Sequence, residues 1–194
     1  MKLTTTLLIL LTLLSTALAL PQTPASDATT SPPPWLPLNR TTPHFNLVTS
    51  VRNISPTNFG FTNLYLHAYH SGAGLNDAVF LADRTRAARG FLNGTYAVFN
   101  LGSQFYYGMR TGYVPYGSWG PVYINARTGD RGFVISDGRF VRVDGNFGGW
   151  MVCDWWRNVP QLFMKFRFGA ERAVIPGSCA EVDLIVEYLA ESSE

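Results

Sequence analysis

The stretch from Gly149 to Leu189 decides the fold. It reads GWMVCDWWR at 149–157, PQLFMKF at 160–166 and PGSCAEVDLIVEYL at 176–189. The last segment alternates apolar residues with acidic ones: Val182, Leu184, Val186 and Tyr188 against Glu181, Asp183 and Glu187. A period of two is what a half-buried strand requires. We therefore expect two or three core strands here, clamped by one disulfide between Cys153 and Cys179.

The two cysteines are the only ones in the chain. A disulfide between them closes a loop of about 26 residues, which in the chain-entropy model contributes about 3 to 4 kcal/mol. The alternative is a nucleophilic cysteine, which needs a polarising histidine and leaves an odd thiol in an oxidising compartment. The sequence favours the disulfide.

Composition indicates one β-rich domain with few charged residues. Of 194 residues, 46% are hydrophobic and 14% aromatic, with 18 glycines, whereas only 14% are charged. The formal charge of +2 falls to about +1 without Lys2. A balance this close to neutral gives no electrostatic footprint for nucleic acid or for an anionic membrane, so neither is an expected partner.

The N-terminus has the pattern of a secretory signal peptide, residues 1–19. A basic start is followed by an apolar run and by Ala17-Leu18-Ala19, which suits signal peptidase. A membrane anchor is the alternative, but the run is too short to span a bilayer comfortably. Residues 20–41 are rich in Pro, Thr and Ser, and we expect a disordered tail. The secreted, extracellular β domain is then 42–191.

Three triplets match the N-glycosylation acceptor. They begin at Asn39, Asn53 and Asn93, and the second is the poorest because Pro56 follows it. A chain of this length carries about one or two such triplets by chance, so only the secretory context gives them weight.

The rest of the chain reads as about ten short strands separated by Gly, Asn and Pro. The clearest signal is Asp137-Gly138 between β-branched runs, which predicts a two-residue hairpin turn with Ile135 facing Phe140. Helical character is confined to Asp83–Arg89, and Gly112–Pro121 reads as a loop. We expect an all-β, mostly antiparallel single domain, a β-sandwich or barrel with at most a short helix and one disulfide.

No catalytic, metal or cofactor site emerges from the polar residues. All five glutamates lie between Glu171 and Glu194, and no acid pair is placed on facing strands. His67 and His70 point to opposite faces of a strand, which disfavours a shared metal ion. His70-Ser71 with Asp77 invites a Ser-His-Asp hypothesis, but G-x-S-x-G is absent, and a tight glycine loop explains the stretch. We predict no catalytic residue, no metal and no cofactor.

Aromatic residues are the best functional lead. Five cluster within about fourteen residues: Tyr106, Tyr107, Tyr113, Tyr116 and Trp119. Exposed rings stack on the apolar faces of sugars or bind a partner protein. The alternative is that these rings fill a β core, as large rings usually do. Tyr113, Tyr116 and Trp119 are the candidate ligand-binding residues.

One likeness brings these features together. The signal peptide, the stretch Tyr69–Val79 (YHSGAGLNDAV) and the C-terminal residues resemble a family of small secreted fungal proteins, a domain of unknown function. The C-terminal residues that carry the likeness are Trp150, Cys153, Pro160, Leu162, Phe163, Cys179, Val182 and Leu184. The resemblance covers Phe45 to Leu189. It implies a secreted, disulfide-bearing β domain and supplies no catalytic residue.

Function remains open between three classes at this point. The leading hypothesis is a secreted non-catalytic module that recognises an extracellular glycan or protein. It rests on the near-neutral charge, the lack of paired acids and the tyrosine-rich loop. The alternatives are an extracellular polysaccharide-acting hydrolase and a structural cell-wall protein. Whether the protein is an enzyme is undecided, and the balance favours a non-catalytic role.

Overall fold

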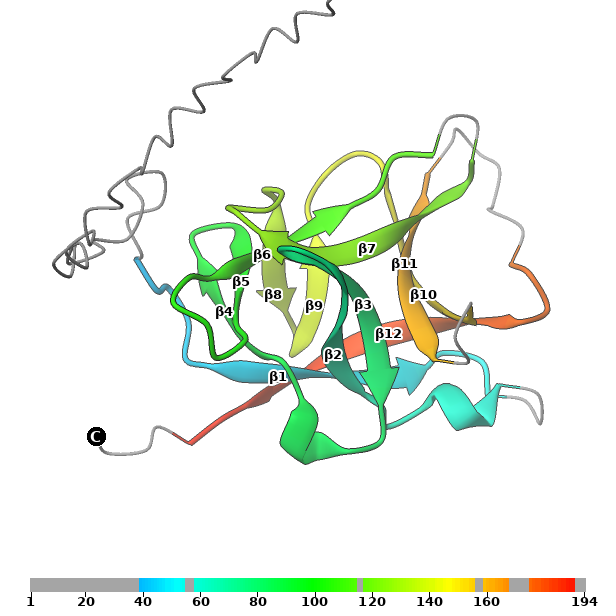
Figure 1. Cartoon of the computed structure of the whole chain (residues 1–194). Coiled ribbons are helices and arrows are strands. Elements are labelled where there is room, and N and C mark those ends of the chain that lie inside the picture. The colour runs from blue at the N-terminus through cyan, green and yellow to red at the C-terminus, as the bar shows by residue number, and fades with distance from the viewer. Residues whose placement is uncertain (1–38, 55–57, 115–116, 156–158, 168–174, 191–194) are drawn as a thin grey trace, which may run out of the picture. The chain divides into compact units, whose positions relative to one another are not determined.

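The computed structural model describes residues 39–54, 58–114, 117–155, 159–167 and 175–190. The expected signal peptide, 1–19, lies outside these residues, as does the expected tail up to residue 38. Within the described part the chain is all-β, and every pair of neighbouring strands is antiparallel. The predicted fold class is confirmed (Figure 1).

The strands follow one another along the chain with short connections. They are β1 (Phe45–Val51), β2 (Tyr65–Gly72), β3 (Leu75–Leu81), β4 (Arg89–Asn93), β5 (Tyr96–Asn100), β6 (Tyr107–Thr111), β7 (Trp119–Ala126), β8 (Phe133–Ser136), β9 (Arg139–Arg142), β10 (Phe147–Asp154), β11 (Pro160–Phe166) and β12 (Cys179–Tyr188). Two short 3₁₀ turns, η1 (Phe59–Phe61) and η2 (Arg84–Arg86), interrupt them.

The sheet closes on itself, so the barrel alternative is the one that is realised. Nine strands pair in the order β1-β4-β5-β6-β7-β3-β11-β10-β12, and β12 returns to β1. That closing pair is continuous from Phe45 opposite Tyr188 to Val51 opposite Val182. β2 bridges β1 and β3, and the β8–β9 hairpin joins β12. In Figure 1 the blue β1 and red β12 run side by side. Closure removes most of the free strand edges.

The barrel interior is filled by apolar side chains from alternating strand positions. Phe133, Phe140 and Trp150 form a parallel stack, with ring centroids 5.2 Å apart for the first pair and 6.0 Å for the second. The Trp150 indole Nε1 donates to the carbonyl oxygen of Phe140 over 2.6 Å, which satisfies the one polar atom of the ring. The β8–β9 hairpin is thereby fastened to the core by aromatic packing.

The predicted hairpin and disulfide are both confirmed. Ile135 lies opposite Phe140 across the Asp137-Gly138 turn, where both turn residues have positive φ, 51° and 72°. That combination matches the twist of the flanking strands. Cys153 of β10 and Cys179 of β12 are direct register partners, and they form the disulfide with Cα atoms 3.9 Å apart. Met151 and Phe163 pack beside it in a second, smaller cluster.

Two predictions gave the wrong length for a segment, one for a helix and one for a loop. The helical character of Asp83–Arg89 amounts to η2 alone, whose N-cap Asp83 accepts from the Thr85 backbone N–H. The expected loop Gly112–Pro121 ends earlier, because Trp119 begins β7 and pairs with Lys165 of β11. Long-range strand pairing extended the strand beyond what its glycine and proline content indicates. No helix in the described residues is long and apolar enough to cross a membrane.

Candidate functional site

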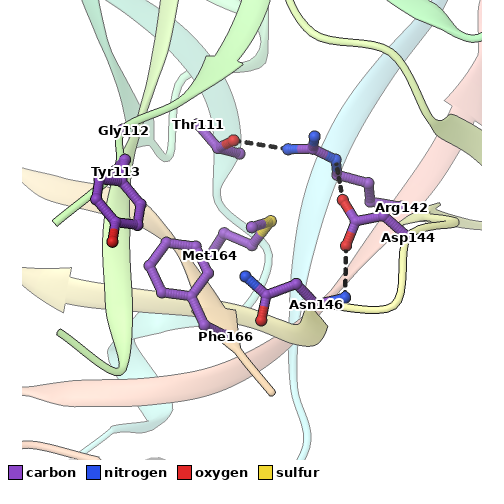
Figure 2. A pocket seen from close by; sticks show the side chains of 8 residues that line it. All are labelled: Thr111, Gly112, Tyr113, Arg142, Asp144, Asn146, Met164 and Phe166. Carbon is purple, nitrogen blue, oxygen red and sulfur yellow. Dashed lines mark hydrogen bonds and ion pairs between the residues drawn. The ribbon is translucent and has the colours of Figure 1, made fainter. Parts of the chain in front are cut away.

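The aromatic candidate Tyr113 lies at a pocket of about 150 Å³, which we call the Tyr113 pocket. Its lining comes from the end of β6, the turn between β9 and β10, and β11. The residues are Thr111, Gly112, Tyr113, Arg142, Asp144, Asn146, Met164 and Phe166 (Figure 2). Residues from three distant parts of the sequence therefore meet at one site.

A glycine in β6 lets the connection after β7 pack closely against β6, next to this site. A Cβ atom at Gly108 would lie 2.3 Å from the backbone nitrogen of Gly129, so no other residue leaves room for that close approach. The connection is held there because Asp130 donates its backbone N–H to the carbonyl oxygen of Met109 over 2.8 Å. Asp130 is thus placed beside Thr111, whose N–H and hydroxyl both donate to Oδ2, each over 2.8 Å.

Arg142 is held at the centre of an ionic cluster. Its Nη1 donates to the Thr111 hydroxyl over 2.6 Å and to Asp130 Oδ2 over 3.4 Å. Its Nε lies 2.5 Å from Asp144 Oδ2 as an ion pair, without the alignment of a hydrogen bond. The guanidinium also sits over the Phe133 ring, 5.6 Å from its centroid. These contacts fix Arg142 and leave each nearby carboxylate compensated by a cation.

The turn after β9 presents the remaining polar group. Asp144 Oδ1 accepts the backbone N–H of Asn146 over 2.9 Å, an Asx turn of the kind that aspartate favours. The Asn146 carboxamide makes no hydrogen bond with the described residues. In Figure 2 it lies on one side of Met164 and Phe166, and the Tyr113 ring lies on the other. The pocket therefore has an aromatic wall, an apolar floor and an open amide.

Burial separates the three predicted ligand-binding aromatics. Tyr113 is 79% exposed. Trp119 is half-buried, and its ring packs edge-on against Phe163 and Trp155, with centroids 5.1 Å and 6.0 Å away. Tyr116 lies outside the described residues. Both alternatives for the aromatic cluster thus apply, because one ring faces solvent and another packs in the small cluster beside the disulfide.

The predicted glycosylation acceptors differ in environment. Asn39 and Asn53 are exposed, whereas Asn93 is only 8% exposed. Asn93 Oδ1 accepts the backbone N–H of Asn39 over 3.0 Å. Attachment of sugar at any of the three stays a prediction.

No group of three or more His, Cys, Asp or Glu in the described part of the chain is arranged to hold a metal ion. Burial, with a smaller contribution from Asp77, raises the pKa of Tyr123. Hydrogen bonds from the Thr85 side chain and backbone lower the pKa of Asp83. Neither residue lines the Tyr113 pocket.

Sequence reasoning found Tyr113 but missed Arg142, Asp130 and Asn146. Arg142 is a charged residue at the end of a strand, and no feature of the sequence around it predicts an ion pair with Asp130. The one available signal was Asp144-Gly145-Asn146, which has the composition of an Asx turn and places two polar side chains together.

Comparison with known proteins identifies one likeness. A family model described as a domain of unknown function (DUF7907) matches residues 42–188. No curated protein and no solved structure has detectable similarity to the chain.

Proposed function

The chain belongs to the DUF7907 family, a domain of unknown function, and from the geometry of its own residues we propose that it is a non-catalytic recognition module. It binds one neutral sugar ring of an extracellular glycan in the Tyr113 pocket. The observation that carries the proposal is the exposed Tyr113 ring and the open Asn146 amide on either side of Met164 and Phe166.

That arrangement suits the two kinds of surface on a sugar ring. The C–H faces of a pyranose are apolar and stack on aromatic rings, while its hydroxyls need hydrogen-bond donors and acceptors. Tyr113 and Phe166 supply the rings, and Asn146 supplies both a donor and an acceptor. A volume of about 150 Å³ is well below that of drug-sized pockets, so it admits one ring and not a chain segment.

The ionic cluster supports binding over hydrolysis. A glycoside hydrolase uses one carboxyl as a proton donor and a second carboxylate as nucleophile or base. Asp130 and Asp144 both contact the same guanidinium, and Asp130 also accepts two hydrogen bonds from Thr111. These contacts hold Arg142 and Thr111 in place, so both carboxylates already have a structural role beside the pocket.

An extracellular location is part of the proposal. The Cys153–Cys179 disulfide supports it, because disulfides persist in oxidising compartments and are rare in the cytosol. The signal-peptide pattern at residues 1–19 and the low content of charged residues point the same way.

The test is retention of the purified protein on insoluble chitin, glucan, mannan and xylan, with reducing-sugar release measured in the same tubes. We expect retention on at least one polymer without sugar release. Tyr113→Ala and Asn146→Ala should each weaken retention about tenfold, the loss of one stacking contact or one hydrogen-bonded amide.

Tyr188→Ala is the matched control, because Tyr188 is exposed at the end of β12 and does not line the pocket. Its retention should equal that of the unmodified protein. Sugar release abolished by Asp144→Asn would replace the proposal with the hydrolase alternative. Retention unchanged in both pocket variants would also refute it.

A further inference from the structure

A second pocket, of about 380 Å³, shares no residue with the Tyr113 pocket. We call it the Asn76 pocket. It lies among β2, β3, the residues that precede β4, the end of β5 and the start of β6. None of its lining residues is an aspartate or a glutamate. Its volume falls in the range of ordinary ligand pockets, about 300 to 1,000 Å³.

Asn76 is a polar residue at a core-facing position. It shares the inward face of β3 with Ala78 and Phe80, and it is only 5% exposed. Its Nδ2 donates to the carbonyl oxygen of Ile124 over 2.8 Å, which ties β3 to β7. Its Oδ1 accepts no hydrogen bond from the described residues. Because this oxygen is still accessible, it can accept from a ligand N–H or O–H.

Two further polar groups of the pocket are already oriented by the fold. His67 Nδ1 lies 2.9 Å from the carbonyl oxygen of Arg86. Since a carbonyl can only accept, Nδ1 carries the hydrogen, and Nε2 of the neutral ring is an acceptor. Asn100 Oδ1 accepts the N–H of Gly102 over 2.9 Å, which leaves its Nδ2 as a donor. These three residues thus offer two acceptors and one amide donor, beside the Thr85 and Tyr107 hydroxyls and the Arg86 guanidinium of the same lining.

The rest of the lining is mixed: Thr85, Arg86 and Tyr107 add polar side chains, and four residues are small or apolar. Ala68, Ala87, Ala88 and Leu101 contribute only methyl and isobutyl groups, and Ala88 is buried. Ala88 also donates its N–H to the carbonyl oxygen of Leu66 over 2.7 Å, so this wall is fastened to β2. Alanine methyl groups in the same lining as an amide donor and an amide acceptor suit an acetamide group.

We propose that the Asn76 pocket binds an N-acetylated amino sugar. The acetamido N–H donates to Asn76 Oδ1, its carbonyl oxygen accepts from Asn100 Nδ2, and its methyl group contacts the alanines. A ring hydroxyl donates to His67 Nε2. This site is separate from the function proposed for the Tyr113 pocket and does not depend on it.

The experiment is titration of the full-length protein with N-acetylglucosamine, glucose and glucosamine, followed by amide chemical shifts in NMR spectra. We expect N-acetylglucosamine to bind at least about tenfold more tightly than the other two, because both lack the acetyl methyl group and the acetyl carbonyl oxygen that accepts from Asn100 Nδ2. The largest shifts should fall on Asn76, Ala88 and Asn100.

Two substitutions at less buried positions keep the test independent of folding. Ala87→Leu fills the methyl niche, and Asn100→Ala removes the donor; each should weaken N-acetylglucosamine binding at least about tenfold. Ala73→Leu, in the exposed β2–β3 turn, is the matched control and should leave it unchanged. Equal affinity for the three sugars, or full affinity in Ala87→Leu, would overturn the inference. Loss in Tyr113→Ala with full affinity in Ala87→Leu would place the sugar in the Tyr113 pocket, which overturns this site while the proposed function stands.

Discussion

The Tyr113 pocket and the Asn76 pocket differ in what their polar groups contact. In the Tyr113 pocket the charged groups contact one another: Arg142 holds Thr111, Asp130 and Asp144. In the Asn76 pocket no carboxylate lines the wall, and a buried amide is satisfied on its nitrogen but not on its oxygen. In the Tyr113 pocket the charged groups hold one another in fixed positions, whereas in the Asn76 pocket a neutral acceptor is left for a ligand.

This difference teaches how to weigh charged residues in a pocket. Two aspartates beside a cavity suggest catalysis. Here both contact one guanidinium, so they stabilise the structure around the pocket. An asparagine attracts less attention, yet an amide oxygen that no described residue pairs, on a side chain lining a cavity, is the stronger indication of a ligand. In both pockets an asparagine amide remains for a ligand, and the Asn76 pocket also has the Arg86 guanidinium in its lining.

The largest expected effect is a loss of stability, caused by a backbone contact beside the Tyr113 pocket. Gly108→Ala places a Cβ against the backbone of Thr128 and Gly129 and should displace Asp130 from Thr111. We expect the free energy of unfolding to fall by about 2 to 4 kcal/mol. Denaturant unfolding measures it, and Gly177→Ala, with open space around its Cβ, is the control. An unchanged stability would show that this connection does not hold the Tyr113 pocket together.

The next effect tests whether Trp119 belongs to a binding surface. Trp119→Ala removes ring contacts with Phe163 and Trp155 beside the disulfide, and should lower the free energy of unfolding by about 2 to 3 kcal/mol. Tyr113→Ala removes an exposed ring and should change it by less than about 0.5 kcal/mol. Chemical denaturation of the two variants makes the contrast. A Trp119→Ala protein of normal stability that has lost glycan retention would extend the binding surface beyond Tyr113.

The ionic cluster should contribute somewhat less. Arg142→Met leaves Asp130 and Asp144 without their shared cation, and because the arginine side chain is 17% exposed we expect a loss of about 2 kcal/mol in unfolding free energy. Adding Asp130→Asn should recover part of that loss, since Asp130 would otherwise keep only the exposed Arg110, 3.9 Å away, as a counter-charge. A double-mutant cycle measures the coupling. Additive effects would mean that the cluster does not act as a unit.

The smallest effect concerns the turn that borders the Asn76 pocket. The hydrogen bonds of Thr85 lower the pKa of Asp83 below its ordinary value. A lowered pKa means that the stabilisation is complete above the pKa of unfolded aspartate, about 3.9, and is lost as pH falls through the lower folded pKa. The melting temperature of Asp83→Asn should therefore be slightly lower than that of the unmodified protein at pH 6 and should equal it near pH 2. A difference that persists at pH 2 would contradict this cause.

Local sequence patterns predicted much of the fold. Alternation of apolar residues predicted β1 and β12, Asp137-Gly138 predicted the β8–β9 hairpin with its register, and the two lone cysteines predicted the disulfide. Each of these features depends on residues that are near one another in sequence or are the only members of their type. The same pattern gave Tyr113 as a candidate and could not say that Trp119 packs inward, since both lie in one glycine-rich stretch.

By itself, then, the sequence determined an antiparallel β domain with one disulfide, because strand period, turn chemistry and cysteine count are local or unique properties. Only the tertiary structure decided that the sheet closes into a barrel, that Arg142 lies between Asp130 and Asp144, and that Asn76 faces a cavity. These depend on which strands meet and where a connection such as Thr128–Gly129 can approach another strand. That information lies in the pairing of distant segments, which no local period records.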